Sequence, residues 1–535
     1  MMMTLGCLAL LGTILAAVPS ATADAAGADK LQALRKERRE LAHKRRRLIY
    51  NNDGDDAVYY MREPTAKELL RLRTEGLQGS TVDTLFYCTW SSGFGLFTHR
   101  TRVGQILTKT DGILKKNKVA GLIEQGTDPL EIIVNWCKAN GVEVFWSMRM
   151  NDVHDGGYPE LVPEWKKQHP EYLFGSKDHK PTGVRDGRAW TGVDYGRMAV
   201  RERAFRFIEE VCRNYDVDGI EMDFFRHPIF FKRHAWGQPC GEEELKQMTG
   251  FVRRVRKMTE GIGLQRGRPI LVAVRVPDSV EYCRKIGLDL EGWLAEGLID
   301  LLVPSGYFHL SPWQDFIELG HRYGVPVYPC LSESRLRGEA RKRRNRLEVY
   351  RARALNVWRA GADGVYTFNL FWSPKHRVWR ELGDPELLER LDKTYYVAYR
   401  GFIYADLYLR GGGQYVKIPT LCPERPVSVK PGSPQSTVLT IGDDFEQEKA
   451  RGLAPQVALR LEVSGLAQPA DLRVKVNGTE LGAGTLAKDG WLEFRPDATI
   501  FKLGDNRIEM AAGSGRQVVV RDLALQVTYP KAGGK

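Results

Sequence analysis

Two carboxylates, Glu221 and Asp223, lie two residues apart in the strand-like segment 217–225. Side chains alternate along a strand, so these two acids and Phe225 should face one side, and the apolar residues between them the other. Two acids in one cavity repel each other when both are charged, so their surroundings should raise one pKa and leave the other acid charged. Hydrolysis of a glycosidic bond needs this division into acid and base. In the alternative interpretation, one of the acids pairs with a nearby arginine inside the fold.

Polar side chains also end several other strand-like segments. Charged and amide groups in apolar strands incur a desolvation cost unless they have partners, so a shared polar cavity explains them better than chance. Arginines there could keep the carboxylates charged or bind an acidic group of a substrate. Trp90, Trp146 and Trp372 could stack on sugar rings or belong to the core. The predicted substrate contacts are Trp90, Arg149, Asp152, Arg226, His227, Arg275, Tyr307, Asn369 and Trp372.

A second acid should face Asp223 from another strand. Glu333 follows the apolar run 325–331, and Asp278 comes just after the run 269–276. We favour Glu333, although it could equally form an exposed ion pair with a neighbouring arginine. The separation of the two carboxyl groups decides between a retaining and an inverting reaction, and both remain open at this stage.

Asp152, His154 and His227 carry atoms that bind metals, but their spacing matches no metal motif, so we predict no metal site. No glycine-rich phosphate loop of the GxGxxG or GxxxxGKS/T type follows any of the strand-like segments. This argues against a nucleotide-binding sheet, and we predict no cofactor.

Short apolar runs alternate with amphipathic helical segments over about 300 residues, which predicts a parallel sheet. Seven or eight such repeats favour a closed (β/α)8 TIM barrel, whose catalytic side chains lie at the carboxyl ends of the strands. A third strand is expected in the long interval between residues 150 and 217. The other expected strands are 84–89, 142–150, 219–225, 269–276, 300–307, 325–331 and 364–371.

The chain changes character after about residue 410, where a Gly- and Pro-rich linker is followed by short strand-like runs separated by turn signals such as Asn477-Gly478. This pattern predicts a C-terminal β-sandwich of about 100 residues. The predicted domains are a signal peptide at 1–23, a basic helical segment at 24–80, the barrel at 81–410, a linker at 411–435 and the β-sandwich at 436–535.

The formal charge of +12 comes from two stretches, 30–47 and 334–353, each with nine Lys and Arg against two Glu. The rest of the chain is slightly acidic, so no basic face for nucleic acid is predicted. The second stretch follows the expected seventh strand. It could therefore overlook the mouth of the barrel and attract an acidic polysaccharide, or simply begin a solvated helix.

Residues 5–18 form an apolar run of signal-peptide length, and Ala21-Thr22-Ala23 follows as a small-residue cleavage site. The run is too short to span a membrane, and no later stretch reaches about 18 apolar residues. We therefore predict a periplasmic or secreted protein without a membrane span. Seven cysteines remain after cleavage, an odd number without CxxC pairs, and most of them are interpreted as buried thiols.

The segment Asp218-Gly219-Ile220-Glu221-Met222-Asp223 resembles the DG-x-D/E-x-D signature of several glycoside hydrolase barrels. The nearest resemblance is to the glycosyl hydrolase-like 10 group of exported bacterial proteins, which combine a barrel with a β-sandwich. The chitinase-type family 18 is also similar, but it carries its catalytic Glu where this chain has Phe225. In other retaining barrel hydrolases the Asp that ends the fourth strand is the nucleophile, so the resemblance implies that role for Asp223.

Together these features predict an exported glycoside hydrolase that acts on a neutral or anionic polysaccharide or oligosaccharide. Its predicted catalytic residues are Asp223, Glu221 and Glu333. The alternative is a non-catalytic carbohydrate-binding or surface-scaffold protein with an inactive barrel, a hypothesis that Phe225 keeps open. A third hypothesis is a polyanion-binding protein that acts through the two basic stretches. The predicted partner is a carbohydrate rather than nucleic acid, and the oligomeric state is left open.

Overall fold

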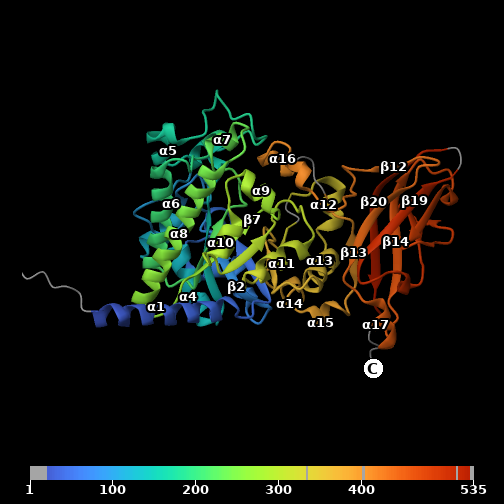
Figure 1. The fold of residues 1–535 in the computed structure, drawn as a ribbon, viewed down its shortest axis with the longest axis horizontal. Helices are drawn as coiled ribbons and strands as arrows, with labels where there is room; N and C mark the ends of the chain where they lie inside the picture. Colours follow the sequence, from blue (N-terminus) through green and yellow to red (C-terminus); the bar gives the residue numbers. More distant parts are fainter. Residues whose placement is uncertain (1–20, 333–334, 400–403, 514–515, 531–535) are drawn as a thin grey trace, which may run out of the picture.

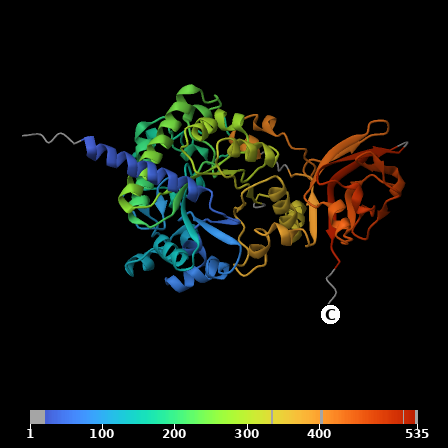
Figure 2. The ribbon, with the colours of Figure 1, turned by 60° about the horizontal axis from the view of Figure 1, so that its bottom comes forward.

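The computed structural model describes residues 21–332, 335–399, 404–513 and 516–530 of the 535-residue chain. The predicted signal-peptide run 5–18 and the predicted acid Glu333 lie outside the described residues. A barrel wrapped in helices and an all-β part lie side by side, with α12 (Gly338–Arg344) and α13 (Leu347–Arg359) on the side of the barrel that faces the all-β part (Figures 1 and 2).

Eight parallel strands form the barrel. Their order around the sheet is β8-β7-β6-β5-β2-β1-β10-β9. The ring closes between β8 and the residues before β9, because the Tyr328 N–H donates to the Leu302 carbonyl oxygen over 2.9 Å. This arrangement confirms the predicted (β/α)8 fold. The strands are β1 (Leu48–Asn52), β2 (Val82–Tyr87), β5 (Glu143–Arg149), β6 (Gly219–Asp223), β7 (Leu271–Val276), β8 (Leu301–Pro304), β9 (Cys330–Leu331) and β10 (Val365–Thr367).

Amphipathic helices cover the outside of the barrel. In α6 (Met198–Asn214), the apolar residues Val200, Ala204, Phe207 and Val211 recur every three or four positions and are buried on one face. The N-terminus of α4 (Pro129–Ala139) is fixed by Asp128, whose carboxylate accepts from the Glu131 N–H. The other covering helices include α2 (Ala66–Arg73), α8 (Glu242–Arg266), α10 (Leu290–Ala295), α11 (Trp313–Arg322) and α13.

The first strand of the barrel differs from the prediction. No strand is present between residues 150 and 217, all of which are described, so the expectation of a third strand there is wrong. The missing strand is β1, which pairs with β2 and β10 and lies inside the predicted basic segment 24–80. The barrel sheet therefore begins at Leu48 rather than after residue 80. The interval 150–217 instead contains short helical turns, α5 (Glu164–Gln168) and α6.

The basic residues before β1 hold the first helix on the barrel. Glu260 of α8 accepts hydrogen bonds from both Arg35 and Arg38 of α1 (Ala21–Ala42), each over 2.8 Å. Arg46 is buried and forms an ion pair with Glu143 at the start of β5. The described helices include none that is long and apolar enough to cross a membrane. The seven cysteines of the described part form no disulfide bond with one another, and all except Cys240 are buried.

The all-β part is a sandwich of two antiparallel sheets around a single apolar core, which confirms the prediction. Its first strand comes earlier than expected, because β11 precedes the predicted linker 411–435 and pairs with β20. One sheet contains β11 (Lys393–Tyr396), β12 (Val427–Val429), β14 (Gln456–Ser464), β17 (Thr485–Leu486), β18 (Trp491–Phe494) and β20 (Val518–Thr528). The other contains β13 (Gln435–Ile441), β15 (Leu472–Val476), β16 (Thr479–Glu480) and β19 (Gly504–Ala512).

Part of the predicted linker packs back on the barrel instead of spanning a gap. The Lys417 N–H donates to the Leu310 carbonyl oxygen over 2.7 Å. The Tyr282 hydroxyl donates to the carbonyl oxygen of Ala405 in α16 (Tyr404–Tyr408) over 3.0 Å. The chain thus enters the sandwich with β11, returns to the barrel and enters the sandwich again with β12.

The second basic stretch holds the sandwich on the barrel. Arg344 forms a two-point ion pair with Asp522 of β20, and the shortest N–O distance is 2.6 Å. Arg343 pairs with Glu462 of β14 over 2.7 Å. Two arginines that were expected near the mouth of the barrel therefore face the sandwich, because β14 and β20 supply carboxylates for them.

Candidate active site

The alternation of side chains along β6 follows the prediction. Ile220, Met222 and Phe224 belong to the apolar core on the helix side, and Phe225 belongs to the separate core inside the barrel. Glu221 also points inward, but it lies below the mouth with no exposed surface. Its carboxylate accepts from the Ser147 hydroxyl over 2.5 Å and from the Tyr366 hydroxyl over 3.0 Å. The prediction that Glu221 faces a water-accessible pocket is wrong, because other strands already supply its partners.

Replacing Glu221 should change how stability depends on pH. Burial raises the pKa of Glu221 to about 7, so between about pH 4.5 and 7 the folded chain holds a proton that the unfolded chain lacks. Stability should therefore fall as pH rises through this window, by at most about 1.4 kcal/mol per pH unit from this one group. Glu221→Gln should keep the two hydroxyl contacts and remove that part of the slope. Urea unfolding of both proteins at several pH values measures it, and equal slopes would contradict the assignment.

Asp223 lies at the end of β6 in a salt bridge. Its Oδ1 accepts from the main-chain N–H groups of Phe225 and Arg226 and from Nε of Arg275, and its Oδ2 accepts from Nη2 of Arg275 over 2.5 Å. Arg275 is buried and its guanidinium lies 3.6 Å from the centre of the Phe368 ring. Asp223 is 3 % exposed. The arginine pairing, considered above as an alternative, is therefore present at Asp223, and Oδ2 keeps one lone pair on the side away from Arg275.

Arg149 joins two further carboxylates at the mouth. Its guanidinium lies 2.9 Å from Asp53, which follows β1, and 3.5 Å from Asp152, which follows β5. Burial alone would raise the pKa of Asp53, but the charges of Arg149 and Arg226 outweigh it and lower the pKa to about 2. Asp53 is therefore a permanent negative charge at neutral pH.

Asp55 has the opposite character. Burial raises its pKa to about 6 despite an ion pair with Arg73, and the neighbouring Asp56 adds to the rise. The adjoining residues Asp56–Tyr60 form a π-helical turn, a rare conformation that is frequent at functional sites. Sequence analysis missed this group, although the run NNDGDD at 51–56, which begins with the last two residues of β1, was its signal. Asp55 is thus a carboxyl group that titrates close to neutral pH beside the charged Asp53.

Two exposed aromatic rings flank Arg73. Its guanidinium carbon lies 4.9 Å from the Tyr60 ring centre and 4.1 Å from that of Phe371, and the two side chains are 52 % and 41 % exposed. Phe371, rather than the predicted Trp372, is the exposed ring after β10. Trp372 packs against Tyr350 of α13 and His376, on the helix side. Exposed aromatic rings beside polar groups are suited to stacking on a sugar.

Asp152, His154 and Arg226 form a hydrogen-bonded series. Nδ1 of His154 lies 2.7 Å from Oδ2 of Asp152, and Nη2 of Arg226 lies 3.3 Å from Nε2 of His154. A guanidinium can only donate, so Nε2 accepts and the proton of the neutral ring lies on Nδ1, directed at the carboxylate. Burial lowers the pKa of His154, which favours this neutral form. The series continues from Arg226, through its main-chain N–H, to Asp223.

Asp152, His154 and His227 also lie close enough together to suggest a metal site, since their ligand atoms all lie within 4.8 Å of one another. A metal on Nδ1 of His154 would replace its proton and force a proton onto Nε2, where it would meet the donors of Arg226. Arg149, at 3.5 Å from Asp152, adds a second positive charge. These contacts disfavour a cation at this cluster.

Adding Zn²⁺ or Ni²⁺ should therefore leave the melting temperature unchanged. A metal that bound this site would stabilise the fold by about 2.7 kcal/mol at 100 times its Kd. Thermal unfolding with and without each ion measures the effect. A rise in melting temperature that occurs with the wild-type protein and is absent in His227→Ala would show that the cluster binds metal.

Several buried polar atoms at the mouth have no hydrogen-bond partner among the described residues. They are Nε and Nη1 of Arg226, the hydroxyl of Tyr307, Nε1 of Trp90 and Oδ1 of Asn369. Buried polar groups in folded proteins are almost always paired, so a set of unpaired ones just after β2, β6, β8 and β10 indicates a place for a polar ligand. The mouth also carries backbone strain, since Thr89, Trp90, Ser305 and Asn369 have φ between 46° and 75°.

The structure thus places most of the predicted contacts together. Arg149 lies within ion-pair distance of Asp152, and Arg275 forms an ion pair with Asp223. The guanidinium of Arg226 lies over the ring of Tyr307. His227 lies 3.7 Å from Asp152, and Trp90 packs near Arg149 and His154. Trp146 is fully buried, and its ring N–H donates to Thr89.

Asp278, the other acid considered above, has a structural role. Its carboxylate accepts from the N–H groups of Leu310 and Ser311 and so holds the loop after β8. Burial raises its pKa to about 7.

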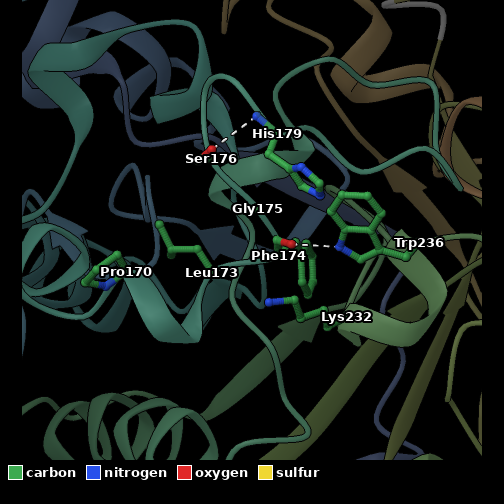
Figure 3. Close-up of a pocket in the computed structure, with 8 residues that line it drawn as sticks. All are labelled: Pro170, Leu173, Phe174, Gly175, Ser176, His179, Lys232 and Trp236. Carbon is green, nitrogen blue, oxygen red and sulfur yellow. Dashed lines mark hydrogen bonds between the residues drawn. The ribbon is translucent and has the colours of Figure 1, made fainter.

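A separate groove lies outside the barrel mouth, between the long β5–β6 connection and α7 (Lys232–Ala235). Figure 3 shows Trp236 and His179 beside each other, with the indole N–H donating to the Phe174 carbonyl oxygen over 2.8 Å. None of the described residues that line it carries a carboxylate, so they offer no acid and base pair.

Comparisons with known proteins find likeness at the level of the fold. No family model and no curated protein sequence matches the chain. Similar solved structures include a cycloisomaltooligosaccharide glucanotransferase from Paenibacillus sp. (10 % identity, TM-score 0.36, 90 % of this chain and 57 % of that one). Another is the α-galactosidase AgaB from Geobacillus stearothermophilus (9 % identity, TM-score 0.36, 94 % of this chain and 59 % of that one). A third is the maltogenic α-amylase AmyB from Thermotoga neapolitana (14 % identity, TM-score 0.34, 86 % of this chain and 98 % of that one).

The chain spans less than three fifths of the length of the first two. None of these structures represents the glycosyl hydrolase-like 10 group, so that resemblance stays a prediction. The function proposed below rests on the geometry of the barrel mouth.

Proposed function

We propose that the protein is an exported glycoside hydrolase whose reaction takes place at the barrel mouth. The single observation that carries the proposal is the difference between two carboxyl groups at the carboxyl ends of barrel strands, one held in a salt bridge and one with a raised pKa. Asp223 is fixed by Arg275 and two main-chain N–H groups. Asp55 has a pKa of about 6. Hydrolysis of a glycoside needs one carboxylate that stays charged and one carboxyl group that can give up a proton near neutral pH.

The proposed roles follow from these states. Asp55 gives its proton to the glycosidic oxygen as the bond to the anomeric carbon breaks. Oδ2 of Asp223 stabilises the positive charge on that carbon, either by bonding to it or by taking a proton from the attacking water. Water supplies the hydroxyl group of one product and the proton that returns to Asp55. Glu333 stays a predicted alternative acid outside the described residues, and Glu221 takes a positioning role beneath Asp223.

The remaining residues of the mouth are suited to holding a sugar. Tyr60 and Phe371 offer exposed rings for stacking, and the unpaired donors of Arg226 and Trp90 offer hydrogen bonds to hydroxyl or acidic groups. The Asp152–His154 pair orients Arg226 through Nε2 of His154.

A non-catalytic carbohydrate-binding protein is the second candidate. It is favoured by two observations, the hydrogen bonds of buried Glu221 with Ser147 and Tyr366 and the two-point pairing of Asp223 with Arg275. Under this hypothesis the same mouth binds a glycan without breaking it.

The release of reducing ends from a panel of neutral, uronate-bearing and sulfated polysaccharides distinguishes the two candidates. The hydrolase should release reducing ends from at least one member. Its rate should fall as pH rises above about 6, because Asp55 then loses the proton that it donates. Asp55→Asn should lower the rate about 10²- to 10⁴-fold.

Asp278→Asn is the matched control, since Asp278 also has a raised pKa but holds the loop after β8. It should leave the fall in rate above pH 6 in place. Saturable binding without any release of reducing ends would support the non-catalytic candidate instead.

A further inference from the structure

A second cavity, with a volume of about 600 Å³, lies between the carboxyl ends of β8 and β9 and the outer face of β13. Figure 1 shows this region where α11, α12 and α13 approach β13. The volume lies within the range of about 300–1,000 Å³ that is usual for small-ligand sites. Interfaces between two parts of a chain are also a frequent location for such sites.

The lining of this cavity is rich in aromatic rings. Tyr307, Phe308 and Trp313 come from the barrel, and Tyr396 and Tyr399 come from β11 and the residues after it. The Tyr307 hydroxyl and Oδ1 of Asn356 are buried without a hydrogen-bond partner among the described residues. Aromatic faces together with unused polar atoms are what a carbohydrate requires of its binding site.

The charge of the lining is positive. Arg335, Arg344 and Arg353 line the cavity, whereas Asp505 is its single carboxylate among the described residues. Arg344 is neutralised by Asp522, but Arg335 lies over the Tyr307 ring at 4.2 Å. Burial lowers the pKa of His309 to about 3, so this side chain adds no charge. The guanidinium group of Arg335, beside an aromatic ring in the lining, favours an anionic ligand.

Tyr307 connects this cavity to the barrel mouth. Its ring contacts Arg335 at 4.2 Å and Arg226, the residue with unpaired donors at the mouth, at 5.2 Å. Burial lowers the pKa of Arg226 to about 9, although the charges of Asp53 and Asp152 act to raise it. An acidic group of a bound ligand would pair with Nε and Nη1 of Arg226 on one side of the Tyr307 ring, or with Arg335 on the other.

We infer that the cavity between the barrel and β13 binds acidic sugar units, bearing a uronate carboxylate or a sulfate ester, of the same glycan that reaches the barrel mouth. This inference rests on the proposed function for the identity of the glycan as a substrate. The β-sandwich is then one wall of the binding site rather than only a support for the barrel.

Substitutions on the outer face of β13 test the inference without altering the mouth. Val438 lines the cavity and is half-buried, whereas Ser436, two residues earlier on the same face, is exposed and does not line it. Val438→Trp should fill the cavity, and Ser436→Trp is the matched control. Thermal unfolding checks that both variants are folded.

Binding is measured by calorimetry with three probes of equal length: tetragalacturonate, a heparin tetrasaccharide and neutral maltotetraose. The wild-type protein should bind at least one acidic probe more tightly than maltotetraose. Val438→Trp should weaken that binding at least tenfold, and Ser436→Trp should not. Arg335→Gln should weaken binding of the acidic probe but not of maltotetraose. The two acidic probes distinguish a carboxylate from a sulfate ester.

Absence of binding by both acidic probes, or equal affinity of Val438→Trp and the wild-type protein, would overturn the inference. The measurement needs no turnover, so it separates the two proposals. Binding that depends on Val438 without hydrolysis of any polysaccharide would reject the proposed reaction and keep the cavity as a glycan site. Hydrolysis of a polysaccharide without binding that depends on Val438 would keep the proposed reaction and reject the cavity as a glycan site.

Discussion

Arg275→Met is expected to destabilise the protein by about 3–5 kcal/mol, because it leaves the buried carboxylate of Asp223 without its cation. Both side chains are almost completely buried, and two hydrogen bonds join them. The free energy of unfolding in urea, followed by circular dichroism, measures the loss. The same variant should also lose hydrolytic activity, because Asp223 would no longer be held in place.

A double substitution separates the charge effect from packing. Arg275→Met combined with Asp223→Asn removes both charges, so it should recover most of the lost stability while remaining inactive. Arg253→Met is the control, since Arg253 also forms a two-point pair, with Glu296 at 2.8 Å, but on the exposed surface. It should cost less than about 1 kcal/mol. A cost for Arg275→Met no larger than that of the control would contradict the account of the salt bridge.

Arg344→Met should separate the unfolding of the sandwich from that of the barrel. Asp522 has no exposed surface, and Arg344 holds it through two hydrogen bonds. Loss of this partner should cost about 3 kcal/mol, the lower end of the usual range, because Arg343 remains at 3.4 Å. Calorimetry should show a lower first transition and a wider spacing between the transitions of the two parts.

Arg341→Met, on the exposed side of the same helix α12, is the matched control. It should change the unfolding free energy by no more than about 0.5 kcal/mol. If both substitutions gave the same calorimetric trace, the two parts of the chain would be held together by contacts other than the Arg344–Asp522 pair.

The sequence predicts the barrel well where a strand is a continuous apolar run. Residues 271–276 and 301–304 are buried throughout and read as strands. β1 escapes detection because it has only five residues, ends in Asn51 and Asn52, and follows directly on a basic helix. Its two asparagines are buried because the barrel surrounds them, and that burial is a property of the closed ring rather than of the local sequence.

The contacts of the candidate site, like the burial of β1, depend on residues far apart in the sequence. Alternation along β6 correctly places Glu221 and Asp223 on the inner face. It does not show that Tyr366 reaches Glu221 across 145 positions of sequence or that Asp223 lies beside Arg275 in the register of β6 and β7. Which acid is exposed depends on these long-range contacts. Likewise, His154 becomes important only because Arg226, 72 residues later, donates to it.

The most direct test of the account is the turnover of Asp223→Asn on the polysaccharide that the wild-type protein degrades, with binding measured in parallel. The account predicts a loss of about 10²- to 10⁴-fold in the release of reducing ends, with glycan affinity and circular dichroism unchanged. A folded Asp223→Asn protein that released reducing ends at the wild-type rate would contradict it.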